Sequence, residues 1–204
     1  MRMYLSLAVA LVATCSPAPA FACTPQPSLV AAAAALDKDR VGYPRAVVRA
    51  IAGAVAATCH DSKMVGDHYW PATWVLGSCE LDAIALLVLA WEEGRFCLGS
   101  GPACPRGDHG HSVGTFQVSG WVAGEWNAEL TDLYERDIDA AARAAYASLR
   151  TGATACPDEP LAPYCGGCHP DYSRPHATDS RAMAHAREAR ARALFDAVVN
   201  PEAP

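Results

Sequence analysis

The segment from Glu80 to Glu93 constrains the fold of this 204-residue chain more than any other. Its large apolar side chains recur at helical spacing, and most positions between them are also alanine or leucine. A helix that is apolar almost all the way round is stable only when other elements cover it. We therefore expect a mainly α-helical domain built around this segment, with the helix ending at Gly94.

Four further helices are expected to surround the central one. Residues 60–78 should be irregular, because Gly66, Pro71 and Gly77 interrupt them. The segment 112–118 alternates well enough to be one short strand of a single small β-hairpin. The expected helices run from Ser28 to Leu36, from Pro44 to about Thr58, from Asp132 to about Arg150, and from Asp179 or Ser180 onward.

The first 22 residues have the pattern of a secretory signal peptide. Arg2 precedes an apolar run that is too short to span a membrane, and Ala20-Phe21-Ala22 fits a cleavage site. We therefore expect an exported protein, secreted or periplasmic, with residues 23–204 forming a single domain. A lipid anchor on Cys15 is the alternative, although Thr14 is a poor match before a lipidated cysteine.

The cysteine count agrees with export. Nine cysteines occur, and eight remain once Cys15 leaves with the signal peptide. An even, high count in an exported domain predicts disulfides. Cys97 and Cys104 are the most plausible pair, because the loop between them is short and rich in Gly and Pro. The other pairings stay open among Cys23, Cys59, Cys79, Cys156, Cys165 and Cys168.

The charge balance argues against nucleic acid as a partner. The chain carries 16 basic and 22 acidic residues, and loss of Arg2 leaves 15 against 22, or about −7. Such a chain has no general basic field to hold phosphates. Its positive charge gathers in the last expected helix, at Arg181, Arg187, Arg190 and Arg192, so the local field there differs from the net charge.

Two glutamates end the central helix, and one of them is a candidate general acid. A carboxyl group at the end of a buried helix is partly desolvated, which disfavours its charged form. Cleavage of a glycosidic bond needs such an acid to protonate the leaving oxygen. We expect Glu92 to be solvated or paired with an arginine, and the spacing to Phe96 in the motif described next assigns the acid to Glu93.

Three motifs carry a resemblance to a known superfamily. Glu93-Gly94-Arg95-Phe96 resembles the Glu-Ser-x-Phe signature of the lysozyme superfamily. Gly107-Asp108-x-Gly110, followed by Gly114-x-x-Gln117-Val118, is similar to a segment of goose-type lysozymes and soluble lytic transglycosylases. Tyr164-Cys165-Gly166-Gly167 resembles the Tyr-Asn-Ala-Gly motif of the transglycosylases. The three occur in the right order and span roughly residues 80 to 170.

The resemblance implies a lysozyme-like α+β domain that cleaves the β-1,4 bond between N-acetylmuramic acid and N-acetylglucosamine in peptidoglycan. It implies Glu93 as general acid and Asp108 as a second catalytic residue that positions water or substrate. No metal or organic cofactor is required, and a monomer is expected. The implied cleft residues are Ser112, Gly114, Phe116, Gln117 and Tyr164.

The motifs leave the reaction type open. Asp108 favours hydrolysis of the goose type, whereas Tyr164 favours transglycosylation, in which Glu93 acts as acid and then as base and leaves a 1,6-anhydro product. The chain departs from the family at Gly94, where Ser is usual, and at Cys165, where Asn is usual. Thr115-Phe116 also replaces the usual Leu-Met pair.

Other functions compete with this interpretation. Cys165-Gly166-Gly167-Cys168-His169 matches the attachment pattern of a c-type haem, although only 35 residues follow it. His109 and His111 suggest zinc weakly, without a clear third ligand. A wall-binding module without catalysis is a third possibility. Aromatic residues between positions 60 and 78, Trp70 and Trp74 among them, either stack on sugars or cover the core.

Overall fold

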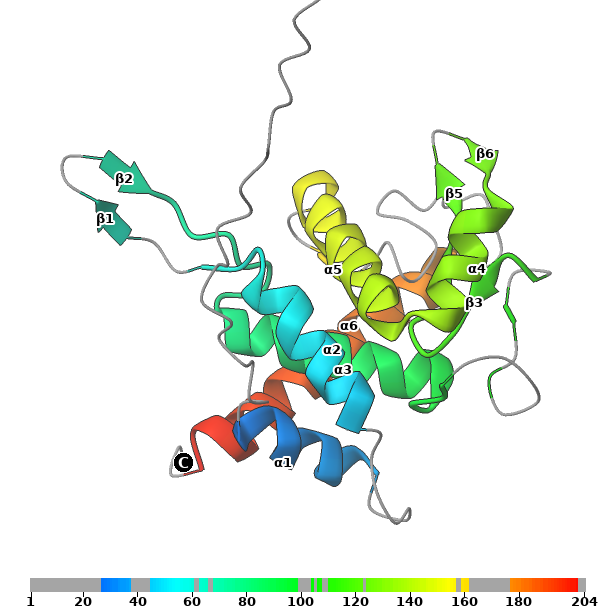
Figure 1. Cartoon of the computed structure of the whole chain (residues 1–204). Helices are drawn as coiled ribbons and strands as arrows, with labels where there is room; N and C mark the ends of the chain where they lie inside the picture. The colour runs from blue at the N-terminus through cyan, green and yellow to red at the C-terminus, as the bar shows by residue number, and fades with distance from the viewer. Residues whose placement is uncertain are drawn as a thin grey trace, which may run out of the picture.

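The computed structural model describes residues 27–37, 45–60, 63–65, 68–98, 104, 106–107, 110–122, 124–156, 159–161 and 177–201. The expected signal peptide, residues 1–22, lies outside the described residues. So do Cys23, Asp108, His109, Tyr164 and the Cys165–His169 motif. Figure 1 shows a helical body from which small hairpins project.

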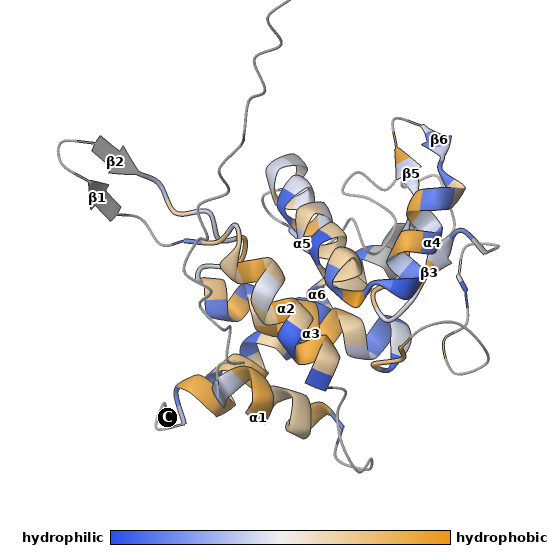
Figure 2. Ribbon diagram, viewed as in Figure 1, coloured by the Kyte–Doolittle hydropathy of each residue, from blue (hydrophilic) through white to orange (hydrophobic). Residues whose placement is uncertain are grey.

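Helix α3 (Cys79–Gly94) is the centre of the fold, as the sequence predicts. Every residue from Ala83 to Ala90 is buried, and Figure 2 shows the apolar character of this helix. Helices α1 (Pro27–Leu36), α2 (Arg45–Ala56) and α6 (Ala177–Val199) pack against it. Helix α5 (Ile138–Ala155) packs on α2. The core therefore forms around α3, because burying a helix that is apolar on all sides needs neighbours on several faces.

The two ends of α3 have different physical causes. At the start, the Ser78 side chain accepts a hydrogen bond from the Leu81 backbone N–H at 3.1 Å, an N-cap. At the end, the residue in the left-handed conformation is Arg95, with φ 49°. Gly94 is the last helical residue, so the helix ends at this glycine as expected, although the left-handed cap is the next residue and not the glycine itself.

One long helix was expected between Asp132 and Arg150, and the structure has two. Helix α4 (Ala128–Arg136) begins at Asn127, whose side chain accepts from the Leu130 N–H. Helix α5 begins at Asp137, whose carboxylate accepts from the backbone N–H groups of residues 139 and 140. These two residues are the N-caps, and Asp132 lies inside α4. Helix α5 also continues past the expected end near Arg150, to Ala155.

The described residues contain three small antiparallel hairpins, so the expectation of one hairpin was wrong. β1 (Lys63–Val65) pairs with β2 (His68–Trp70), in a segment expected to be irregular. β3 (Ser112–Val113) pairs with β4 (Val118–Ser119), and β5 (Trp121–Val122) pairs with β6 (Glu125–Trp126). The segment 112–118 is therefore not one strand. It contains a turn at residues 114–117.

Disulfides join neighbouring elements, as the cysteine count predicts. Cys97 pairs with Cys104, which confirms the expected bridge, with the two Cα atoms 5.2 Å apart. Cys59 pairs with Cys79 and ties the chain after α2 to the first turn of α3. Cys156 is also disulfide-bonded, so every cysteine in the described part of the chain is oxidised.

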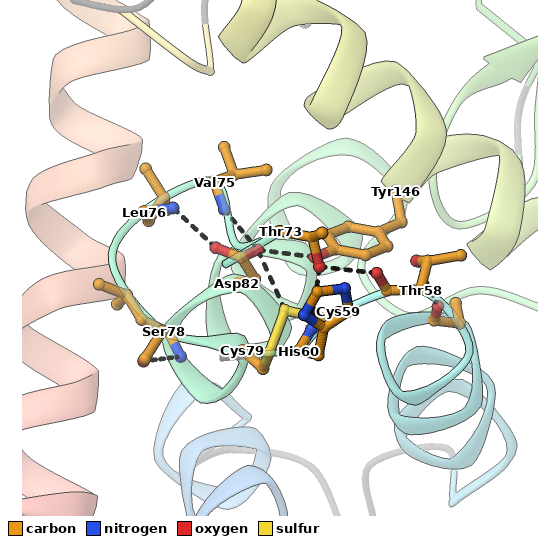
Figure 3. Close-up of a disulfide and its surroundings, with 12 residues drawn as sticks. Thr58, Cys59, His60, Thr73, Val75, Leu76, Ser78, Cys79, Asp82 and Tyr146 are labelled. Carbon is orange, nitrogen blue, oxygen red and sulfur yellow. Dashed lines mark hydrogen bonds between the residues drawn. A yellow bond between two sulfur atoms is a disulfide. The ribbon is translucent and has the colours of Figure 1, made fainter. Parts of the chain in front are cut away.

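A buried polar network lies beside the Cys59–Cys79 bridge (Figure 3). Asp82 accepts hydrogen bonds from the backbone N–H groups of Val75 and Leu76, both at 2.8 Å, and from the Tyr146 hydroxyl at 2.7 Å. Burial raises the pKa of Asp82, and these hydrogen bonds offset only part of the rise. The pKa of Tyr146 is raised by burial and by donation to Asp82. The network joins α3, α5 and the segment that precedes α3, and none of its residues lines the cavity described below.

Candidate functional site

A cavity of about 870 Å³ lies where the C-terminal end of α3 meets the hairpins. Its wall combines residues from α3, β3–β4, β5, α4, α5 and α6. Among the described residues of the wall, Glu93 from α3 is the only carboxylic acid and Arg187 from α6 is the only arginine. The remaining wall is a mixture of hydroxyl, amide and apolar groups. This composition suits a neutral, polar ligand such as a sugar.

Glu93 is held by a buried arginine. The Nη2 atom of Arg187 lies 2.6 Å from Oε1 of Glu93, while Nε of the same guanidinium lies 2.9 Å from Oε2 of Glu92. Arg190 binds the other oxygen of Glu92 at 3.1 Å. Glu92 is therefore an arginine partner, one of the two roles expected for it. Glu93 is the member of the pair that faces the cavity.

The cluster is more buried than an ordinary surface ion pair. The Arg187 side chain is only 6% exposed, and those of Glu92 and Glu93 are 23% and 21% exposed. Removing one partner from a buried pair leaves an uncompensated charge, which costs far more than loss of a surface pair. The position of Glu93 is therefore set by α6 as well as by its own helix.

The β3–β4 hairpin supplies further polar groups to the cavity wall. Gly107 and Ser112 form an antiparallel bridge, and both line the cavity. Gln117 also lines it and has a left-handed backbone, with φ 47°. Its side-chain Nε2 donates to the Gly114 carbonyl at 2.9 Å, so the amide is held in place by the turn itself. A non-glycine residue kept in this conformation is often found at a functional site.

Gly94 is required by close packing between α3 and this hairpin. A Cβ atom at position 94 would lie 2.6 Å from the carbonyl oxygen of Thr115 and 2.8 Å from its carbonyl carbon. The Thr115 hydroxyl also donates to the Ala90 carbonyl at 3.2 Å. Gly94 thus lets the hairpin contact the helix directly beside Glu93.

The structure brings together part of the expected site. Glu93, Ser112 and Gln117 line the same cavity. Phe116 is completely buried in the core, because the turn at residues 114–117 points its ring inward, so it does not line the cleft. Gly114 turns the chain, with φ 70°, and is not part of the wall. Asp108 and Tyr164 lie outside the described residues.

Several wall residues were not anticipated from the sequence. Arg187 was noticed only as one of a group of arginines, and its contact with Glu93 spans nearly a hundred positions of chain. Two adjacent glutamates in one expected helix and several arginines in another were the sequence signal that could have indicated this contact. No local pattern singles out the remaining members of this group, which include Trp121, Val122, Tyr134, Ser148, Thr151 and Met183.

The described residues offer no evident metal site. Nowhere among them do three or more His, Cys, Asp or Glu side chains gather as metal ligands would. The ring of His111, one of the two histidines considered for zinc, lies against Trp121 and Trp126. None of the helices in the described ranges is long and apolar enough to cross a membrane. Comparison with protein-family models, curated proteins and solved structures gave no match.

Proposed function

We propose that this chain is an exported enzyme with a lysozyme-like fold that cleaves the β-1,4 bond between N-acetylmuramic acid and N-acetylglucosamine in peptidoglycan. One observation carries the proposal. At the end of a buried helix, one carboxylate, Glu93, faces a large cavity with a mixed polar and apolar wall, and no second acid lies among the described wall residues. This arrangement favours lytic transglycosylation, in which one carboxyl group serves both steps.

In the first step, Glu93 gives its proton to the glycosidic oxygen. The bond from that oxygen to C1 of the muramic acid breaks, and positive charge develops on the sugar ring. Arg187 then stabilises the carboxylate that remains. Donation requires Glu93 to be uncharged, so the proposal includes weakening of the Arg187 contact when a glycan enters the cavity.

In the second step, the Glu93 carboxylate takes the proton from the C6 hydroxyl of the same muramic acid. The C6 oxygen bonds to C1, which closes a 1,6-anhydro ring and returns Glu93 to its starting state. No water is consumed. A polar wall that includes Gln117 and Ser112 would hold the N-acetyl and hydroxyl groups during both steps.

Hydrolysis is the second candidate for the same site. Gly107 lines the cavity, and the next residue in the sequence is Asp108, which carries a second carboxylate. In that mechanism Asp108 would position water, and the product would carry a reducing end. The two mechanisms share Glu93 and differ in whether a water oxygen enters the product.

The experiment that tests the proposal is release of soluble fragments from purified peptidoglycan by the parent, Glu93→Gln and Glu188→Gln. Glu188 is a matched control, because it follows Arg187 in α6, binds only Arg192 among the contacts described for it, and does not line the cavity. We expect at least a hundredfold loss in Glu93→Gln and parental activity in Glu188→Gln. If all three proteins bind peptidoglycan and none releases soluble fragments, the chain is a wall-binding module and the proposed enzymatic function is wrong.

A further inference from the structure

The hairpin β5–β6 presents two large apolar side chains to solvent at the cavity. Trp121 is 53% exposed and Val122 is 54% exposed, although most large apolar residues described in this chain are buried. Both residues also line the cavity that contains Glu93. Exposed apolar side chains are common singly, but a pair at the wall of a polar cavity has a surface suited to a ligand.

This hairpin is fixed at its base. Two-stranded hairpins are marginally stable alone, and β5 and β6 have two residues each. The backbone N–H of Asn127 donates to the Gly120 carbonyl at 3.0 Å, which closes the base of the hairpin. A Cβ atom at Gly120 would collide with the Asn127 carbonyl oxygen and with Thr131, so the chain contacts the start of α4 directly.

One aromatic ring, that of His111, contacts both tryptophans of this hairpin. His111 lies 5.7 Å from the Trp121 ring and 4.9 Å from the Trp126 ring, to which it is nearly perpendicular. The indole N–H of Trp126 donates to the Thr131 hydroxyl at 3.0 Å. Trp121 is also the cross-strand partner of Trp126. The exposed indole is therefore held in a fixed position, which reduces the entropy lost when a ligand stacks on it.

We propose that Trp121, together with Val122, is a stacking platform for an N-acetylhexosamine ring of the glycan, at one side of the cavity from which Glu93 acts. A pyranose ring has one face of C–H groups and a rim of hydroxyl and amide groups. The indole offers the flat apolar surface that such a face needs, and polar wall groups stand at Ser119, Ser148 and Thr151. The identity of the glycan rests on the proposed function.

The chemistry of the wall favours a sugar over a protein as the occupant. A protein partner of useful affinity generally needs a wide contact surface. Here the exposed apolar residues border a concave wall whose remaining groups are a mixture of polar and apolar side chains. The platform is also continuous with the cavity of the proposed catalytic acid, so a strand lying on Trp121 would extend toward Glu93.

The test is binding of a β-1,4-linked N-acetylglucosamine tetramer, followed by calorimetry, in the Glu93→Gln background that prevents cleavage. Trp121→Ala should weaken binding about tenfold, and Trp121→Phe should recover most of the loss. Trp74→Ala is the matched control, because Trp74 is similarly exposed, at 42%, but does not line the cavity. We expect its affinity to stay within twofold of the parent.

The outcomes separate this inference from the proposed function. Equal affinity of Trp121→Ala and Trp74→Ala would overturn the platform, as would failure of the tetramer to bind the parent. Fragment release with an unchanged KM in Trp121→Ala would also overturn it while leaving the enzyme intact. Trp121-dependent binding without fragment release by the unsubstituted chain would support the platform and reject the catalytic function.

Discussion

Replacement of Arg187 by Met tests whether α6 holds the proposed catalytic acid. The substitution keeps an unbranched side chain of similar length but removes the guanidinium that joins Glu92 to Glu93. Glu92 keeps its contact with Arg190, whereas Glu93 loses its cation. Two adjacent carboxylates, each about one-fifth exposed, then stand at the end of a buried helix.

The size of the effect follows from the burial of the cluster. Breaking a fully buried pair costs about 3–5 kcal/mol, whereas an exposed pair contributes about 0–1 kcal/mol. Arg187 is nearly buried and its partners are partly so, which places the expected loss in the free energy of unfolding at about 2–3 kcal/mol. For a chain of this size, that corresponds to a fall in Tm of roughly 4–12 °C.

Thermal unfolding of Arg187→Met, Arg187→Lys and Arg190→Met measures this loss. Lysine keeps the charge but lacks the planar fork that reaches both carboxylates, so we expect an intermediate effect. Arg190 is 45% exposed and binds Glu92 alone among the contacts described for it, so its loss should lower the free energy of unfolding by less than about 1 kcal/mol. Equal effects of Arg187→Met and Arg190→Met would refute the reasoning.

Three further substitutions have defined outcomes. Gly94→Ala should lower the free energy of unfolding by about 2–3 kcal/mol and reduce fragment release, because the added Cβ would collide with the Thr115 backbone beside Glu93. An unchanged denaturant midpoint would contradict this. The double substitution Cys97→Ser and Cys104→Ser should lower the free energy of unfolding in urea by about 2.5 kcal/mol, a modest loss because the disulfide closes only a short loop. A stability equal to the parent's would contradict this. Burial raises the pKa of Asp82 above its unfolded value of 3.8. The free energy of unfolding of the parent, relative to that of Asp82→Asn, should therefore be greatest below pH 3.8 and decline as the pH rises. A relative stability that increases between about pH 4 and pH 7 would exclude burial as the dominant cause.

Local patterns predicted the centre of the fold. The apolar character of α3 required burial on all sides, and that burial placed Glu93 at the boundary between core and solvent. The short, Gly- and Pro-rich loop between Cys97 and Cys104 was enough to identify their disulfide. These features depend on residues close together in the sequence, where spacing determines geometry.

The errors arose where two local signals competed. Asp132 and Glu135 have the spacing of a helix start, but the Glu135 carboxylate instead binds Arg106, at 2.6 Å and 3.0 Å. That contact lowers the pKa of Glu135. The true N-cap, Asp137, was hidden inside an otherwise continuous helical pattern. Propensity alone does not decide between two such starts.

The composition of the site depended on contacts that sequence patterns do not reveal. The family resemblance implied Phe116 as a cleft residue with Ser112 and Gly114, and alternation along residues 112–118 predicted a strand there. The tight turn breaks that alternation and buries the ring. Arg187 reaches Glu93 only because α6 packs along α3. A site assembled from seven helices and strands is fixed by tertiary packing, which periodicity in a single sequence leaves undetermined.

The most direct test of the central claim is mass spectrometry of fragments released from peptidoglycan in ¹⁸O-labelled water. If Glu93 acts as acid and then base, the parent should release 1,6-anhydro fragments that contain no ¹⁸O, and Glu93→Gln should release none. Reducing ends carrying one ¹⁸O atom would contradict the single-carboxylate mechanism and establish hydrolysis. Equal release by the parent and Glu93→Gln would contradict the assignment of Glu93 itself.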